Sequence, residues 1–226
     1  MKVVITGGKR GIGTAITAHF EGLGHDVVPL ASADLDVTDE AAVARVFGEI
    51  GDVDVLVNNA GVSSSAPLKR TTLDEWHRQM DVNATGAFLC TRAVLEGMRS
   101  RDFGRIVTVA SLASHVGSRY TSGYTASKHA VIGLMRSVAA EVAGTGVTAN
   151  SVCPAYVRSD MTDATIANIQ ARTGREDGQE VLAKMAALGR LIEPEEVAFA
   201  VAFFASPEAG AINGQSLIMD GGGYQQ

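Results

Sequence analysis

The sequence predicts an α/β fold in which a parallel sheet is covered by helices on both faces. Short apolar runs rich in β-branched residues alternate along the chain with segments of helical periodicity, which is typical of parallel sheets. The chain has 25 glycines and only 5 prolines, and many of the glycines directly follow the apolar runs. Such folds turn from strand into helix at these points. Both observations therefore favour the same fold class.

Six apolar segments are expected to form the strands. The first, Lys2–Thr6, is a continuous β-branched run of the kind that is buried on both faces of a parallel sheet. The fifth is stopped by Pro154, because proline cannot continue a central strand. The strands after the first are Val27–Leu30, Asp54–Val57, Arg105–Ala110, Val147–Val152 and Ser216–Met219.

Four segments show the apolar spacing of helices that pack on a sheet. Thr14–Leu23 is closed by Gly24, and Pro194–Ala205 carries proline in its first turn, where helices accept it. Leu73–Met98 and Tyr124–Ala143 are longer, and they carry more apolar residues than one sheet face should need. We therefore expect these two helices to pair with another copy of the chain, in a homodimer or a homotetramer.

The composition excludes several classes of protein. Hydrophobic residues make up 46% and charged residues 19% of the 226 residues, as in ordinary globular domains. The 25 acidic side chains outnumber the 19 Lys and Arg, and the net charge of −6 argues against the basic surface that nucleic acids require. The apolar runs are shorter than the ~18 residues that a membrane span needs. We therefore expect neither a nucleic-acid partner nor membrane association.

The cysteines and histidines indicate the cellular location and bear on metal binding. Cys90 and Cys153 are too few for a disulfide framework, which favours a reducing, cytoplasmic location. The apolar run that starts at Lys2 leaves no room for a signal peptide. The histidines have no spacing typical of a zinc site, so we expect no metal.

A glycine-rich loop, Thr6-Gly-Gly-Lys-Arg-Gly-Ile-Gly13, joins the first predicted strand to the first predicted helix. Glycines let the turn tighten and let backbone N–H groups approach a pyrophosphate, while the helix N-terminus favours negative charge. The spacing is neither G-x-G-x-x-G nor a Walker loop. A simple tight turn would explain the loop as well, but its position in the first strand–helix connection favours nucleotide binding.

Four polar residues are candidates for catalysis. Tyr124 and Lys128 are four positions apart near the start of a predicted helix, so they lie on one face. A phenol with a pKa of ~10 exchanges protons poorly at neutral pH, and we expect the ammonium group to lower that pKa. Ser111 follows a strand and can hold a substrate oxygen, although it or Ser114 could simply cap a turn. Asn83 is unfavourable inside a helix, which suggests a special role.

Three motifs together resemble those of the short-chain dehydrogenase/reductase family. They are the glycine loop, Asn58-Asn59-Ala60-Gly61 and Tyr124-x-x-x-Lys128, and the likeness extends to the closing Asp220-Gly221-Gly222. The resemblance implies a single-domain, Rossmann-type, doubly wound sheet over residues 1–226. The cofactor-binding half would cover about 1–110, and the catalytic and substrate half about 111–226. The polar stretch Met161–Leu188 would form a lid at about 160–188, with a surface insertion as the alternative.

The resemblance implies hydride transfer between a nicotinamide ring and a carbonyl or carbinol carbon. Tyr124 would exchange the proton on oxygen, Lys128 would tune Tyr124 and hold the nicotinamide ribose, and Asn83 would complete a proton relay. Substrate would contact Ser111, Tyr124 and Tyr156. Cofactor-binding positions are carried over, residue by residue, to Gly7, Lys9, Arg10, Gly11, Ile12, Gly13, Ser32, Asp36, Val37, Asn59, Ala60, Gly61, Tyr124, Lys128, Pro154, Val157 and Ser159.

The end of the second predicted strand favours NADP over NAD. Ala31 and Ser32 are not acidic, whereas an acidic residue there binds the ribose 2′-hydroxyl of NAD. Arg10 matches a basic position that meets the 2′-phosphate of NADP. The family places a full helix between its second and third strands, but only Ala31–Asp34 separate Leu30 from Leu35-Asp36-Val37. We therefore expect that helix to be missing and the connection between strands 2 and 3 to be shortened. Asp34 could then reach the ribose site.

The favoured hypothesis is therefore an oxidoreductase acting on a ketone or secondary alcohol, such as a 3-oxoacyl thioester or a cyclic ketone. One alternative is a catalytically silent NAD(P)-sensing protein. Such proteins usually lose the tyrosine or the lysine, whereas this chain has both Tyr124 and Lys128. Another alternative is a short-chain-type epimerase or dehydratase. Those enzymes generally carry a larger substrate domain, for which 226 residues leave little space.

Overall fold

The computed structural model describes residues 1–173, 180, 182–183 and 186–225. Within these residues, six strands form one fully parallel sheet in the order β2-β1-β3-β4-β5-β6. The strands are β1 (Lys2–Thr6), β2 (Asp26–Leu30), β3 (Val55–Asn58), β4 (Gly104–Val109), β5 (Val147–Pro154) and β6 (Ser216–Met219). Each lies within two residues of its predicted bounds, and β5 continues through Pro154 itself.

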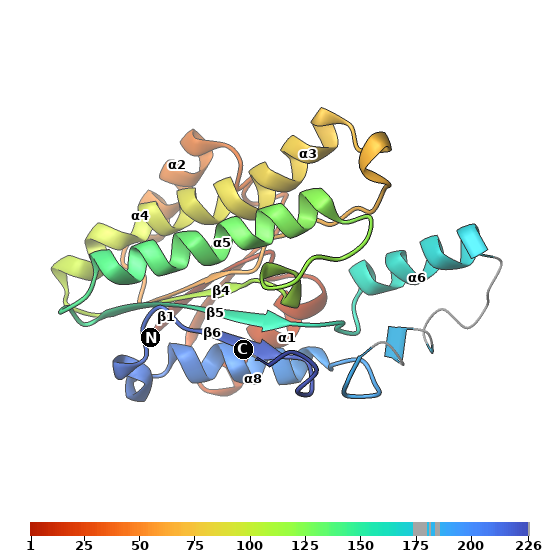
Figure 1. The fold of residues 1–226 in the computed structure, drawn as a ribbon. Helices are drawn as coiled ribbons and strands as arrows, with labels where there is room; N and C mark the ends of the chain where they lie inside the picture. Colours follow the sequence, from red (N-terminus) through yellow and green to blue (C-terminus); the bar gives the residue numbers. More distant parts are fainter. Residues whose placement is uncertain (174–179, 181, 184–185, 226) are drawn as a thin grey trace.

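Helices cover both faces of the sheet, as the sequence predicts (Figure 1). One face carries α2 (Glu40–Ile50), α3 (Leu73–Met80), α4 (Gly86–Ser100) and α5 (Ser122–Glu141), and the other carries α1 (Gly11–Gly22) and α8 (Pro194–Ala205). Each face has its own apolar core. Phe47, Leu89 and Met135 belong to the first core, and Phe20 and Phe204 to the second. The fold is therefore the doubly wound, Rossmann-type arrangement.

The strand order reverses direction beside β1. The chain places β2 on one side of β1 and then crosses to place β3 on the other side. Thr6 at the end of β1 is in register with Asn58 at the end of β3. Ligands of open α/β sheets bind in the crevice at such a reversal, beyond the carboxyl ends of the strands. The glycine loop and the Asn59–Gly61 segment therefore line the same crevice.

Two helical segments differ from their predicted form. Leu73–Met98 is not one helix, because a π-helical turn over Asp81–Thr85 separates α3 from α4. The sequence analysis assigned no element to the residues that form α2. Asp39 caps α2 by accepting the N–H groups of Ala41 and Ala42, and one apolar stripe of the helix packs on the sheet.

The segment between β2 and α2 contains no helix, as expected for Ala31–Asp34. Residues 31–39, all described, form turns and contain neither a helix nor a strand, so β2 is an edge of the sheet. Leu35 and Val37 are nevertheless buried in the core that α2 and α4 share. Pro29 lies in β2, and proline is tolerated on an edge strand because it has no N–H to donate.

The predicted lid lies after β5. Its first part forms α6 (Asp160–Thr173), which extends beyond the carboxyl ends of the strands (Figure 1). Residues 174–179, 181 and 184–185 of the expected lid lie outside the described residues. Among the helices that the structure describes, none is long and apolar enough to cross a membrane.

Candidate active site

The glycine loop is held tightly against the end of β3. Gly7 has a φ of 65°, a conformation that side chains disfavour. A Cβ atom on Gly13 would overlap the carbonyl oxygen of Gly7 and lie 2.8 Å from Nδ2 of Asn59. That Nδ2 atom donates to the carbonyls of Thr6 and Gly7, each at 3.1 Å. Asn59 therefore fixes the shape of the loop from the neighbouring strand.

The start of α1 offers unpaired N–H groups to a ligand. Arg10 is the N-cap residue but makes no capping hydrogen bond with its side chain, and the first turn of α1 carries no acidic residue. An uncapped helix N-terminus behind a glycine loop is a ready site for a phosphate or pyrophosphate. The close packing of Gly13 and the open amides of α1 thus fit a dinucleotide. Gly11 and Ile12 form the first turn itself.

Several predicted adenosine contacts lie around this loop. Lys9, Arg10, Ser32 and Asp36 are exposed. The carboxylate of Asp36 accepts both the backbone N–H and the hydroxyl of Thr38, which lowers its pKa. These hydrogen bonds fix the local turn, while the rest of the carboxylate faces solvent.

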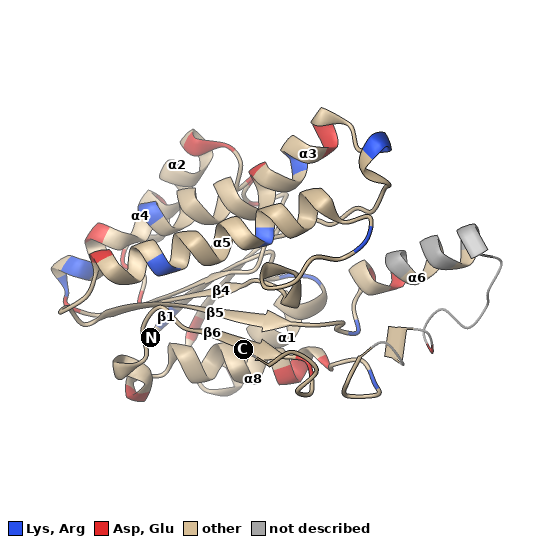
Figure 2. Ribbon diagram, viewed as in Figure 1, with Lys and Arg blue, Asp and Glu red and all other residues tan. Residues whose placement is uncertain are grey.

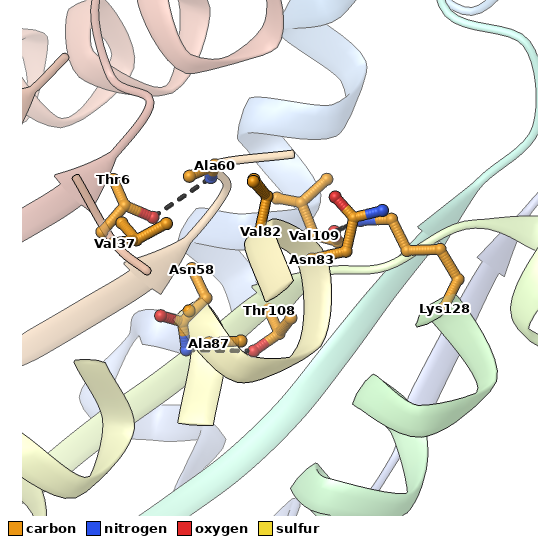
Figure 3. Close-up of a pocket in the computed structure, with 11 residues that line it drawn as sticks. Thr6, Val37, Asn58, Ala60, Val82, Asn83, Ala87, Thr108, Val109 and Lys128 are labelled. Carbon is orange, nitrogen blue, oxygen red and sulfur yellow. Dashed lines mark hydrogen bonds between the residues drawn. The ribbon is translucent and has the colours of Figure 1, made fainter. Parts of the chain in front are cut away.

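Val37 is the buried residue among the predicted adenosine contacts. Its side chain is buried against α4, where a Cβ atom on Gly86 would lie only 2.6 Å from Val37 Cγ2. Val37 also lines a small cavity of about 10 Å³, shown in Figure 3, together with Thr6, Ala60, Asn83 and Lys128. Thr6 Oγ1 accepts the N–H groups of Asn59 and Ala60, each at 3.1 Å. The cofactor crevice and the catalytic residues are therefore continuous.

Asn83 lies at the centre of the π-helical turn and is almost fully buried. Its Oδ1 accepts the N–H of Val62 at 2.8 Å, and its Nδ2 donates to the Val62 carbonyl at 2.9 Å. Nδ2 also donates to Ser127 Oγ at 2.9 Å, and Ser127 Oγ donates to the Tyr124 carbonyl at 2.8 Å. The turn thus aims one amide at the segment after β3 and at the start of α5.

Ser111, Tyr124 and Lys128 meet where β4 ends. Ser111 lies two residues after the end of β4, and the influence of its side chain on Tyr124 is to lower the pKa of that phenol. Ser111 Oγ also accepts the N–H of Ala113 at 3.1 Å, so this serine caps a turn and faces Tyr124. Lys128 Nζ donates to the carbonyl of Val109 at 2.9 Å (Figure 3). The same Nζ lies 5.8 Å from the centre of the Tyr124 ring. Ser114 is buried and is not part of these contacts.

Burial controls the protonation of this group. It lowers the pKa of Lys128 from 10.5 to about 8. It also raises the pKa of Tyr124, and the hydrogen bond with Ser111 only partly opposes that rise. The net pKa of Tyr124 is therefore raised, and the expected lowering by Lys128 stays a prediction. Desolvation of the phenol is the largest influence on that pKa.

The loop after β5 completes the crevice. Val157 is buried and pairs as a bridge with Ile192, while Ser159 Oγ donates to the Val157 carbonyl at 3.3 Å. Tyr156 is half-buried, and burial raises its pKa. Pro154 ends β5 in register with Met219 of β6. The predicted residues Pro154, Val157 and Ser159 are thus adjacent in one ordered turn.

Two residues of the site were missed by the sequence analysis. Ser127 links Asn83 to α5, and Thr6 anchors Asn59 and Ala60 through its hydroxyl. Ser127 stands beside Lys128 in the helix, but helical spacing alone does not show which partner a serine meets. Both roles depend on contacts between segments that are distant in the sequence.

The fold and this site define a class of protein. A dinucleotide cradle adjoins a tyrosine–serine pair, and a lysine lies beneath the tyrosine ring. The protein is a nicotinamide-dependent oxidoreductase.

Comparisons with known proteins specify the class. The family model described as enoyl-(acyl carrier protein) reductase matches residues 6–224. The 3-oxoacyl-[acyl-carrier-protein] reductase FabG of Vibrio cholerae is 38% identical, over 98% of this chain and 96% of the relative. The acetoacetyl-CoA reductase of Shinella zoogloeoides is 34% identical, over 98% and 97%. The chain belongs to the short-chain dehydrogenase/reductase family.

A solved structure supports the same assignment. A variant of actinorhodin polyketide ketoreductase with NADPH matches the fold with a TM-score of 0.90 at 30% identity. The match covers 99% of this chain and 97% of that one. The likeness therefore extends over the whole sheet and both helical layers.

Proposed function

We propose that the protein reduces the ketone of a 3-oxoacyl thioester with NADPH, or catalyses the reverse oxidation. The observation that carries this proposal is the grouping of Ser111, Tyr124 and Lys128 where β4 ends, with Lys128 Nζ held by the Val109 carbonyl and 5.8 Å from the centre of the Tyr124 ring. A serine hydroxyl and a tyrosine hydroxyl from the same end of the sheet suit a single carbonyl oxygen. The 3-oxoacyl and acetoacetyl-CoA reductases among the relatives support the substrate class.

The mechanism follows from these side chains. When bound, the reduced nicotinamide supplies a hydride to the carbonyl carbon. Tyr124 donates its hydroxyl proton to the oxygen as negative charge develops there, and Ser111 holds the same oxygen by a hydrogen bond. Lys128, whose pKa burial lowers to about 8, is held by the Val109 carbonyl and stabilises the phenolate that Tyr124 leaves behind.

Asn83 has a positioning role in this proposal. It ties the segment after β3 to Ser127, and through Ser127 to the Tyr124 carbonyl. The relay that the family resemblance assigns to Asn83 would also use this buried amide, which shares the small cavity with Lys128. Substitution of Asn83 should therefore lower kcat more than it raises KM.

NADP is the proposed cofactor. Arg10 and Lys9 are exposed cations at the glycine loop, while Ala31 and Ser32, the first two residues after β2, are not acidic. The polyketide ketoreductase that shares this fold was solved with NADPH. The other carried-over positions would hold the nicotinamide half, with Gly61 near Asn83 and Pro154, Val157 and Ser159 in the loop after β5.

The test compares wild type with Tyr124→Phe and Ser111→Ala on acetoacetyl-CoA and NADPH. We expect Tyr124→Phe to lose at least about a hundredfold in kcat, as for removal of a general acid. Tyr120→Phe is a matched control, because that tyrosine is 54% exposed and lies outside the hydroxyl pair. Equal turnover by wild type and Tyr124→Phe would refute the proposed acid. No turnover of any ketone by wild type would favour the NAD(P)-sensing alternative.

The description of the matched family model raises a second candidate, reduction of a 2-enoyl thioester. In that reaction the proton goes to carbon, whereas in ketone reduction it goes to oxygen. The Ser111–Tyr124 pair favours the oxygen acceptor. Crotonyl-CoA in the same assay separates the two reactions. A panel of nucleotide sugars tests the epimerase or dehydratase alternative.

We also propose that the protein is a homo-oligomer. Figure 2 shows few charged residues along the middle of α5, and Phe88 of α4 is 41% exposed. A second apolar face lies on α8, where Phe199 and Phe203 are exposed. Two separate faces suit a tetramer with two kinds of two-fold contact better than a dimer. Light scattering at micromolar protein that gives a monomer would refute the proposal, and Phe199→Glu should leave a dimer.

The remaining expectations stay proposals of the same kind. The division into a cofactor-binding half (about 1–110) and a catalytic half (about 111–226), with a lid at about 160–188, suits the position of α6 beyond β5. A cytoplasmic location suits two cysteines that are both free and buried. Limited proteolysis with and without NADPH tests the lid, because closure over the crevice should protect residues 160–188.

A further inference from the structure

An ion pair crosses the rim of the cofactor crevice. Lys9 Nζ lies 2.9 Å from Asp34 Oδ2, and that same oxygen accepts the N–H of Ala31 at 2.7 Å. Lys9 belongs to the glycine loop after β1, and Ala31 directly follows β2. The pair therefore joins the loop that would hold the pyrophosphate to the segment where such folds bind the ribose hydroxyls.

The shortened connection after β2 is what places Asp34 here. Because no helix forms over residues 31–39, the chain turns back at once, and Asp34 returns beside Ala31. The Asp34 N–H donates to the Ala31 carbonyl at 2.9 Å, which closes the turn. The hydrogen bond from Lys9, followed by that from Ala31, lowers the pKa of Asp34, so this carboxylate is charged at neutral pH.

Both members of the pair remain accessible to a ligand. The Lys9 side chain is 50% exposed and the Asp34 side chain 38% exposed. Arg10, the next residue, is exposed and makes no capping hydrogen bond. A phosphate at this rim would thus meet two cations, one of which already has a carboxylate partner.

We propose that the Lys9–Asp34 pair sets the cofactor preference, with Asp34 acting as an internal counter-ion that the 2′-phosphate of NADP must displace from Lys9. Asp34 thereby weakens NADP binding without binding the ribose hydroxyls itself. Lys9 and Arg10 then form a two-cation site for the phosphate. This inference rests on the proposed use of NADP.

Three variants separate the contributions. Asp34→Asn removes the charge but keeps an oxygen that can accept the Ala31 N–H. Lys9→Ala removes the cation and leaves Asp34 uncompensated. Asp52→Asn is the matched control, because it removes one negative charge from another exposed ion pair, with Arg101, before the amino end of β3.

The measurement is equilibrium binding of NADP⁺ and NAD⁺ by calorimetry, without substrate, at low and high salt. Asp34→Asn should bind NADP⁺ about threefold to fivefold more tightly and NAD⁺ unchanged, since exposed charge pairs have effects of that size. Lys9→Ala should weaken NADP⁺ binding alone, and Asp52→Asn should change neither. The gain in Asp34→Asn should shrink at 1 M salt, where exposed charges are screened.

Two results would overturn the inference while the proposed function stands. One is an unchanged affinity of Asp34→Asn for NADP⁺, and the other is a weaker affinity of Asp34→Asn for NAD⁺. The latter would make Asp34 a ligand of the ribose hydroxyls. If wild type binds neither nucleotide, the proposed cofactor use fails and this inference fails with it. Thermal melts of each variant show whether a changed affinity reflects a folded protein.

Discussion

Replacing Lys128 by methionine should abolish turnover and stabilise the folded protein at neutral pH. Burial lowers the pKa of Lys128 from 10.5 to about 8. At pH 7 the folded protein therefore carries the ammonium at a cost of about 3 kcal/mol relative to the unfolded chain, since each pKa unit corresponds to about 1.4 kcal/mol. Methionine fills a similar volume without a charge, but it leaves the Val109 carbonyl without the Lys128 hydrogen bond, which costs about 1–2 kcal/mol.

The expected net gain is thus about 1–2 kcal/mol, or a rise in Tm of a few degrees for a chain of this length. The pH dependence gives the sharper test. A lysine with a lowered pKa destabilises the fold fully below pH 8, and wild type recovers that stability as pH rises from about 8 to 10.5. The advantage of Lys128→Met should therefore be largest below pH 8. Above about pH 10.5 the variant should be less stable than wild type by about 1–2 kcal/mol, because only the lost hydrogen bond to Val109 then remains.

Thermal or urea melts of wild type and Lys128→Met between pH 6.5 and pH 10.5 measure this difference. Lys69→Met, at an exposed lysine in the turn before α3, is the control for replacing a lysine by methionine. A lower Tm for Lys128→Met at pH 7 would refute the reasoning. So would a difference from wild type that stays constant across the pH range.

Three further predictions test the loop and the fold. Arg10→Ala should raise KM for NADPH about tenfold and leave NADH nearly unaffected, because a charge-assisted contact to phosphate is lost; equal weakening of both cofactors would contradict this. Gly13→Ala should abolish nucleotide binding in calorimetry, because its Cβ would overlap the Gly7 carbonyl, and unchanged affinity would show that the loop adapts. Asp39→Ala should lower the free energy of unfolding by about 1 kcal/mol in urea titration through loss of the α2 cap on Ala41, whereas an unchanged midpoint would mean that the cap is dispensable.

The sequence by itself determined most of the fold. The strand Lys2–Thr6 and the helix Pro194–Ala205 have the predicted bounds, because β-branched runs and a proline in the first turn are local signals. The glycine loop and the absence of a helix between Leu30 and Leu35 could likewise be read directly from residue order. The motif residues Asn59, Tyr124 and Lys128 were identified before any contact was known.

Only the tertiary structure decided how the site residues act on one another. The π-helical turn that aims Asn83, and the partners Val62 and Ser127 that it binds, depend on contacts between segments separated by 21 and 44 positions. The pKa of Tyr124 rises instead of falling because burial, which no local pattern reveals, is the largest influence on it. Asp34 meets Lys9 because a shortened chain turns back across two neighbouring strands. The local order of residues determines which segments form strands and helices. The free energies of burying and pairing charged groups depend instead on which of those segments pack together.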